Sequence, residues 1–140
     1  MIKRIYGFNI AVQDLDQAVP KFETLLGVKS RPLQASDFAF PGMKGATLDV
    51  NGVSITLITS TDDNSPAGRF LKSKGEGIML IALESDDVDS DSEKVRSQGL
   101  ALAAPKTMKG GWGKANWIHP KSLHGVQVEI FFPGGVYKKS

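Results

Sequence analysis

Two stretches decide the fold, IAVQDLDQAV at residues 10–19 and IALESDDVDSDSEKV at residues 81–95, because they repeat one local pattern. Each begins with an apolar strand end, continues through Asp-Leu-Asp or Asp-Val-Asp, and passes into a sequence with helical spacing. The offset of about 71–73 residues is half of the 140-residue chain. Because strand-Asp-helix is a common local pattern, a true duplication requires that the elements on either side also match.

The remaining patterns do match, and they predict the order β-α-β-β-β in both halves. In the first half we expect a helix at residues 15–26, capped by Asp14 and ended by Gly27, and strands at residues 2–12, 28–33, 46–50 and 53–59. Asn51-Gly52 joins the last two strands and is a strong hairpin signal. In the second half we expect a helix at residues 88–98, capped by Asp86 or Asp87, and strands at residues 78–84, 100–103, 115–119 and 126–132.

This order predicts an α+β fold in a single domain of residues 1–140. The first βαβββ module spans residues 1–60, a linker spans residues 61–76, and the second module spans residues 77–140. Residues 66–74 form either a short helix or an ordered loop within that linker, and residues 105–113 form a Gly- and Lys-rich loop.

The composition argues against several classes of function. The chain has 17 basic and 15 acidic residues. The first 70 residues carry seven of each, and the second 70 carry ten basic and eight acidic residues. Neither half therefore has the strongly basic composition of a nucleic-acid-binding surface. The absence of cysteine rules out disulfides, thiolate metal sites and a cysteine nucleophile. No apolar run approaches the roughly 18 residues of a membrane span, and no signal peptide begins the sequence. We therefore expect a cytoplasmic protein with no nucleic-acid or membrane partner.

Three motifs carry a resemblance to a known family: IAVQDLDQAV at residues 10–19, SPAGRFLKSKGEGI at residues 65–78 and, most specifically, HPKSLHGVQVEI at residues 119–130. With them the chain resembles the vicinal oxygen chelate superfamily of glyoxalases, bleomycin-resistance proteins and dioxygenases, and within it the methylmalonyl-CoA epimerase-like proteins. The resemblance implies two βαβββ modules whose curved mixed sheets form a cup, often in a homodimer.

The family pattern places four ligands of a divalent metal in that cup. At these positions the chain has Gly7, Thr56, Leu80 and Glu129. Glycine and leucine supply no ligand atom, and one carboxylate with one hydroxyl would hold a divalent cation weakly. We therefore expect no metal site and no cofactor.

Alternation along the strands predicts which side chains face the helices and which line the cup. The helix-facing set is Ile5, Phe8, Ile10, Val12, Ile55, Leu57, Ile81, Leu83, Val126, Val128 and Ile130. The predicted substrate-binding residues are Asn9, Thr56, Leu80, Gln127 and Phe131, with Trp117, Trp112 and Phe40 as aromatic wall. Such a mixture suits an organic ligand with a carbonyl or hydroxyl group.

Glu129 is the candidate catalytic residue. A carboxylate on a central strand among apolar neighbours should have a raised pKa and could serve as a general base or acid. The alternative is a structural group hydrogen-bonded to Thr56 or Asn9. For His119 and His124 a structural turn is favoured over a metal pair. For residues 106–114 a solvated loop is favoured over a lid or a basic rim for a phosphate-bearing ligand.

Three hypotheses for function follow. The first is a metal-independent enzyme of isomerase or lyase type that binds a carbonyl compound or acyl thioester, with Glu129 moving the proton and Asn9, Thr56 and Gln127 orienting the substrate oxygen. The second is a ligand-sequestering protein similar to bleomycin-resistance proteins. The third and least favoured is a metal-dependent epimerase or lactoylglutathione lyase, which would need ligands from a partner chain.

Overall fold

A computed structural model describes residues 1–139, and its backbone divides into two compact units. The N-terminal unit is Gly7–Met79, and the C-terminal unit combines Met1–Tyr6 with the chain from Leu80 onward. The helices are α1 (Leu15–Leu26), α2 (Pro66–Lys74) and α3 (Val88–Ser97). The strands are β1 (Ile2–Ala11), β2 (Arg31–Leu33), β3 (Met43–Val50), β4 (Val53–Ser60), β5 (Gly77–Ser85), β6 (Met108–Gly110), β7 (Gly113–Ile118) and β8 (Val128–Pro133).

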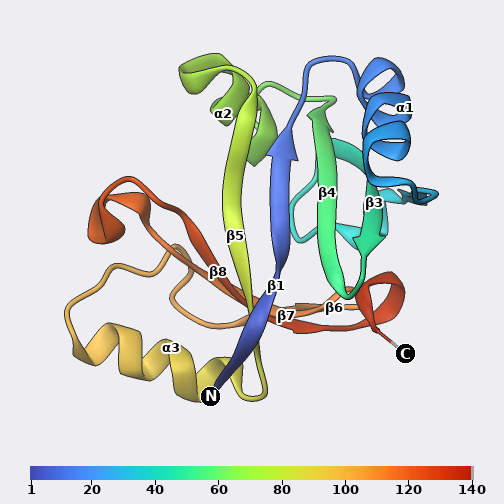
Figure 1. The fold of residues 1–140 in the computed structure, drawn as a ribbon. Helices are drawn as coiled ribbons and strands as arrows, with labels where there is room; N and C mark the ends of the chain where they lie inside the picture. The colour runs from blue at the N-terminus through green and yellow to red at the C-terminus, as the bar shows by residue number, and fades with distance from the viewer. Residues whose placement is uncertain (140) are drawn as a thin grey trace. The chain divides into compact units, whose positions relative to one another are not determined.

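The predicted duplication is confirmed by strand pairing. In the first half β2 pairs antiparallel with β3, β3 antiparallel with β4, and β4 parallel with β1. In the second half β6 pairs antiparallel with β7, β7 antiparallel with β8, and β8 parallel with β5. The same order and the same directions therefore occur twice in the chain, as Figure 1 allows the reader to follow. The fold is α+β, with two βαβββ modules as predicted.

The core of the N-terminal unit lies between α1 and the β3–β4 hairpin. The Asp14 side chain accepts a hydrogen bond from the Gln17 amide, and Gly27 ends the helix in the left-handed conformation, as its position in the sequence predicts. Val12, Leu48 and Leu57 are buried, and the apolar side of α1 packs against them. Asn51 and Gly52 both have positive φ, at 51° and 96°, which is the backbone that a tight hairpin turn requires.

The core of the C-terminal unit lies between α3 and strands β7 and β8 (Figure 1). Val88, Ile118, Val128 and Ile130 are buried together, and Leu83 packs against them. Most of the predicted helix-facing positions are therefore confirmed in both units. Ile5 and Val126 are exceptions, with 49% and 43% of their surface exposed.

Two predicted strands differ in the structure. The strand expected at residues 28–33 contains only Arg31–Leu33, and the strand expected at residues 100–103 makes a single bridge, from Leu102 to Ile118. Two backbone hydrogen bonds remain beside this bridge, from the Ala103 amide to the Trp117 carbonyl and from the His119 amide to the Ala101 carbonyl. Side chains supply the next ones, because the Ala101 amide donates to Ser122 Oγ and the Ala104 amide donates to Asn116 Oδ1. Conversely, the expected loop at residues 105–113 contains β6, which pairs with β7.

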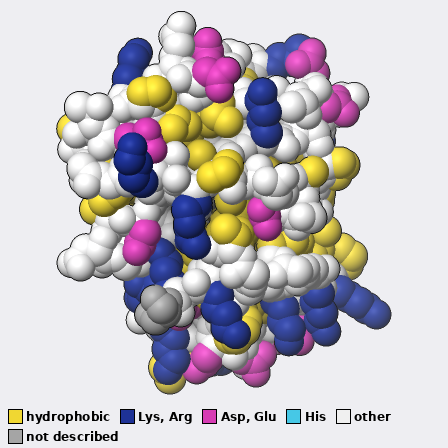
Figure 2. Space-filling model, turned by 90° about the vertical axis from the view of Figure 1, so that its right-hand side faces the viewer, with side chains coloured by type: hydrophobic (Ala, Val, Ile, Leu, Met, Phe, Trp, Pro, Cys, Tyr) yellow, Lys and Arg dark blue, Asp and Glu magenta, His cyan; other side chains and the backbone are white. Residues whose placement is uncertain are grey.

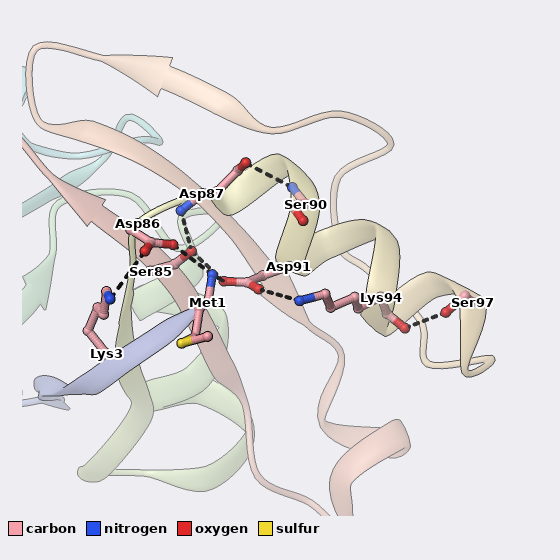
Figure 3. A network of polar contacts seen from close by, with 9 residues as sticks. All are labelled: Met1, Lys3, Ser85, Asp86, Asp87, Ser90, Asp91, Lys94 and Ser97. Atoms are coloured by element: carbon pink, nitrogen blue, oxygen red, sulfur yellow. Dashed lines mark hydrogen bonds and ion pairs between the residues drawn. The ribbon is translucent and has the colours of Figure 1, made fainter.

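A polar network surrounds the start of α3 (Figure 3). Asp87 caps the helix by accepting from the Ser90 amide, and buried Asp91 accepts from Ser85 Oγ at 2.5 Å. The α-ammonium group of Met1 lies 2.7 Å from Asp86 and 3.0 Å from Asp91. These contacts hold the pKa of the Asp86 carboxyl below its usual value and raise the pKa of the Met1 amine.

The surface is unevenly charged despite the small net charge. Figure 2 shows many Lys and Arg side chains along the lower part of one face, with acidic side chains among them and hydrophobic side chains exposed above. Among the described residues, no helix has the length and apolar character needed to cross a bilayer.

Candidate functional site

Glu129 lies on β8, on the face of the sheet opposite α3. Its neighbours Val128 and Ile130 belong to the core beneath α3, so alternation directs Glu129 and Phe131 to the other face. The strand register places Glu129 opposite Trp117 on β7 and Ala82 on β5. Glu129 is partly buried, and Trp117 is only 6% exposed.

The Glu129 carboxyl has a strongly perturbed acidity. Removal from water raises its pKa from 4.5 to about 7, because a buried charge loses its hydration. A hydrogen bond from the Trp117 side chain favours the carboxylate and opposes this rise. The predicted direction of the shift therefore agrees with the structure, and the group changes protonation near neutral pH.

Aromatic rings surround Phe131 on the same face. The Tyr6 ring meets Phe131 edge-on with centroids 5.0 Å apart, and the Tyr137 ring does so at 5.7 Å. The Tyr6 hydroxyl donates to the Tyr137 carbonyl, which ties β1 to the segment that follows β8. The sequence analysis did not select either tyrosine. The only available signal was that Tyr6 precedes the expected ligand position at Gly7, and Tyr137 lies outside every motif.

Strand alternation places Leu80 and Gln127 on the same face of the sheet as Glu129. Trp112 contacts a residue of its own turn. Leu80 is buried on β5, two residues before Ala82, and Gln127 is partly buried just before β8. Trp112 is 6% exposed. Its indole packs so tightly on Gly110 that a Cβ added to Gly110 would lie 2.3 Å from the indole Nε1. This contact shapes the turn between β6 and β7.

The polar residues of the N-terminal unit also lie away from their helix. Asn9 on β1 is paired in register with Thr56 on β4, and both alternate with the core residues beneath α1. The Thr56 hydroxyl is buried and lies 3.0 Å from the Thr47 hydroxyl. Phe40, proposed as aromatic wall, is 36% exposed.

The residues at the family's metal-ligand positions do not fit a divalent cation. A side chain at position 7 would place its Cβ 2.0 Å from the Ser54 carbonyl oxygen, so this backbone excludes any residue larger than glycine. Leu80 is aliphatic, and the Thr56 hydroxyl already has Thr47 as a partner. Among residues 1–139, no three His, Cys, Asp or Glu side chains are grouped for metal binding. Of these four residues, Glu129 is the one whose side chain commonly binds divalent metals.

The histidine loop forms a structural turn, as favoured from the sequence. His119 Nδ1 accepts from the Lys121 amide at 3.1 Å and caps a short 3₁₀ helix, Pro120–Leu123. His124 ends that helix in the left-handed conformation. The His119 imidazole and the His124 backbone therefore shape the approach to β8.

Comparison with known proteins agrees with this architecture. The sequence profile of the glyoxalase/bleomycin resistance protein/dioxygenase superfamily matches residues 8–116. Methylmalonyl-CoA epimerase from Mycobacterium tuberculosis is a similar solved structure, with a TM-score of 0.84 and 30% identity over 96% of this chain and 90% of that one.

Two further relatives are a solved complex and an uncharacterised protein. A single-substitution variant of methylmalonyl-CoA epimerase from Streptomyces coelicolor, solved with 2-nitronate-propionyl-CoA, is similar at a TM-score of 0.84 and 26% identity, over 96% of this chain and 100% of that chain. The uncharacterised protein YqjC of Bacillus subtilis strain 168 is 26% identical over 135 residues, which cover 96% of this chain and 95% of that protein.

Proposed function

Because the chain belongs to the glyoxalase/bleomycin resistance protein/dioxygenase superfamily, we propose that it binds a small acyl thioester or carbonyl compound and moves a proton beside the carbonyl group. The observation that carries the proposal is Glu129, a partly buried carboxyl whose pKa is raised to about 7. The similar epimerase solved with 2-nitronate-propionyl-CoA supports a thioester as the ligand class.

In this proposal the Glu129 carboxylate accepts a proton from the carbon beside the carbonyl and returns it to the resulting enolate. A base whose pKa lies near the working pH is populated in both forms, which suits such a cycle. The hydrogen bond from Trp117 orients the carboxylate, and the rings of Phe131 and Tyr6 limit the access of water. Gln127, on the same face by alternation, is proposed to bind the substrate oxygen. For Asn9, Thr56 and Leu80 a part in substrate binding stays a prediction.

This chemistry is assigned to the side chains of the protein and not to a bound metal. The basis is that Gly7, Thr56 and Leu80 do not fit a divalent cation, as described above. We accordingly expect the rate to be unchanged by a chelator. We also expect a homodimer in the cytoplasm, and light scattering of the purified protein tests the oligomeric state.

The test is exchange of the α-proton of methylmalonyl-CoA for deuterium in D₂O, followed by mass spectrometry. Replacement Glu129→Gln should slow the exchange by at least about a hundredfold, since general acid–base catalysis contributes effects of that size. Glu76→Gln is the matched control, because Glu76 is exposed and accepts only from the Gln13 amide. A loss below about tenfold for Glu129→Gln would exclude Glu129 as the base.

A second candidate function is sequestration of the ligand without chemistry. The observation favouring it is that three of the four ligand positions of the family have lost their ligand groups. The same experiment separates the two functions. Stoichiometric binding of the thioester, with exchange no faster than in buffer, would identify a binding protein.

A further inference from the structure

The segment that follows β8 turns back over the face of the sheet that carries Glu129. β8 ends at Pro133, and a short 3₁₀ helix, Gly135–Tyr137, comes next. The Tyr137 ring meets Phe131 edge-on, with ring centroids 5.7 Å apart. Phe131 lies two residues beyond Glu129 on the same face, which is a separation of about 6.6 Å along a strand. The ring of Tyr137 therefore lies at one end of the proposed active site.

The turn between β6 and β7 holds the start of this segment. The Gly134 amide donates to the Trp112 carbonyl at 2.9 Å. Gly135 has a φ of 54°, and a Cβ added to it would lie 2.6 Å from the Gly111 carbonyl oxygen. Glycine is therefore the residue that lets the segment lie so close to the turn. The backbone that leads to Tyr137 is thus fixed by its own contacts.

β1 holds the end of the segment. The Tyr6 hydroxyl donates to the Tyr137 carbonyl, and the Tyr6 ring meets Phe131 edge-on at 5.0 Å. Tyr6 and Phe131 are each only 4% exposed, whereas Tyr137, Glu129 and Gln127 are partly exposed. The three rings therefore close this face at the Phe131 end, with Tyr137 as the ring that keeps accessible surface. The face is accessible at Glu129 and on the side of Gln127.

On the basis of the proposed function, we propose that Tyr137 is a specificity-determining residue, whose ring limits the acyl group that reacts at Glu129 to one with a short branch. A substrate whose α-carbon lies at the carboxylate points its branch along β8 toward the cluster of rings. A longer branch would have to displace a ring that the turn and β1 both hold. One extra methylene in a filled pocket changes specificity roughly 10–200-fold. The substrate class is therefore an acyl thioester with a small substituent on its α-carbon.

The experiment compares methylmalonyl-CoA, ethylmalonyl-CoA and butylmalonyl-CoA. Exchange of the α-proton in D₂O gives the rates, and calorimetry gives the dissociation constants. The wild type should prefer the methyl branch to the butyl branch by about tenfold or more. Tyr137→Ala should reduce this preference by about tenfold, because it removes the ring and keeps the backbone carbonyl that Tyr6 binds. Tyr6→Phe should act in the same direction by a smaller factor, since it removes only the hydroxyl group that holds the segment.

Phe132→Ala is the matched control for loss of a ring. Phe132 is the neighbour of Phe131, it is 45% exposed, and alternation directs its side chain to the other face. Tyr137→Phe is the control that keeps the ring, and both variants should keep the preference of the wild type. An unchanged preference in Tyr137→Ala, or an equal change in Phe132→Ala, would overturn the proposal.

The two readouts separate this proposal from the proposed function. Binding without exchange in the wild type would exclude the proton transfer, and the dissociation constants would still measure the size limit. Failure of the wild type to bind any of the three thioesters would exclude both the ligand class and the size limit.

Discussion

Glu129 should make the folded protein more stable in mild acid than at alkaline pH. The folded pKa of about 7 lies above the unfolded value of 4.5, so the folded state retains its proton over this interval while the unfolded state loses it. The contribution of Glu129 is therefore intact below pH 4.5 and is lost as the pH rises toward 7 and above. Its full size is at most about 3 kcal/mol, at about 1.4 kcal/mol per pKa unit.

Glu129→Gln removes this dependence, because glutamine stays neutral. We expect the variant to gain stability relative to the wild type at pH 8 and to show little gain at pH 5. Urea unfolding at the two pH values measures the difference. An equal effect of the substitution at both pH values would show that burial does not raise the pKa of this carboxyl.

Gly7 is required by the close approach of β1 to β4. A Cβ at this position would lie 2.0 Å from the Ser54 carbonyl oxygen, and backbone on a paired strand has little room to move. Gly7→Ala should therefore destabilise the protein by about 1–3 kcal/mol or more, as overpacking does. Gly111→Ala is the control, because nothing lies within 4 Å of its Cβ. Comparable urea midpoints for the two variants would contradict the inferred clash.

The sequence could predict Glu129 but not its surroundings. Strand alternation and the last motif identify the residue, its face and the direction of its pKa shift. Tyr6 and Tyr137 could not be found in this way, since their contact joins positions 131 residues apart. The indole of Trp112 packs on Gly110, and its part as a wall of the site stays a prediction.

At the scale of elements, local signals predicted the helices and the hairpin, and tertiary contacts decided the short strands. Asp14, Gly27 and Asn51-Gly52 act through their own backbone neighbours, which is why they could be recognised. Residues 100–103 have the apolar composition of a strand, yet Ser122 and Asn116 side chains satisfy the backbone around them. β6 forms in a Gly- and Lys-rich segment because β7 returns beside it.

Asn116 should therefore contribute to the free energy of unfolding as several hydrogen bonds between paired strands do. Asn116→Ala would leave the Ala104 amide and carbonyl without their partner and would remove the bond from the Trp117 amide, so we expect a loss of about 2–4 kcal/mol from these three hydrogen bonds. Asn64→Ala is the control, because Asn64 is exposed in the turn before α2. Thermal unfolding of the two variants gives the comparison, and equal melting temperatures would mean that water replaces the lost bonds.

At the scale of the whole chain, the duplication was predictable from the sequence, whereas the absence of a metal site at Gly7, Thr56 and Leu80 stays a prediction. The repeated Asp-containing motif is a local signal that occurs twice, and the strand orders β2-β3-β4-β1 and β6-β7-β8-β5 follow it. The substrate cannot be predicted in the same way, because related sheets carry different side chains on their open faces.

Binding of an acyl thioester should stabilise the whole protein by linkage. A ligand at about one hundred times its dissociation constant adds about 2.7 kcal/mol of stability if it binds only the folded state. We therefore expect 2-nitronate-propionyl-CoA to raise the melting temperature by several degrees, with a smaller increase in Glu129→Gln. Free coenzyme A is the control for the acyl group. An unchanged melting temperature at millimolar ligand would contradict the proposed ligand class.

The shortness of β2 and β6 bears on how the protein behaves when concentrated. Each is three residues long and stands at one end of its strand order. Pro32 in β2 has no amide hydrogen to offer to an incoming strand, and Lys109 in β6 brings a charge to the other end. Short, charged or proline-bearing edges are how sheet proteins avoid joining edge to edge. We therefore expect the outermost strands to limit aggregation through the sheet edges.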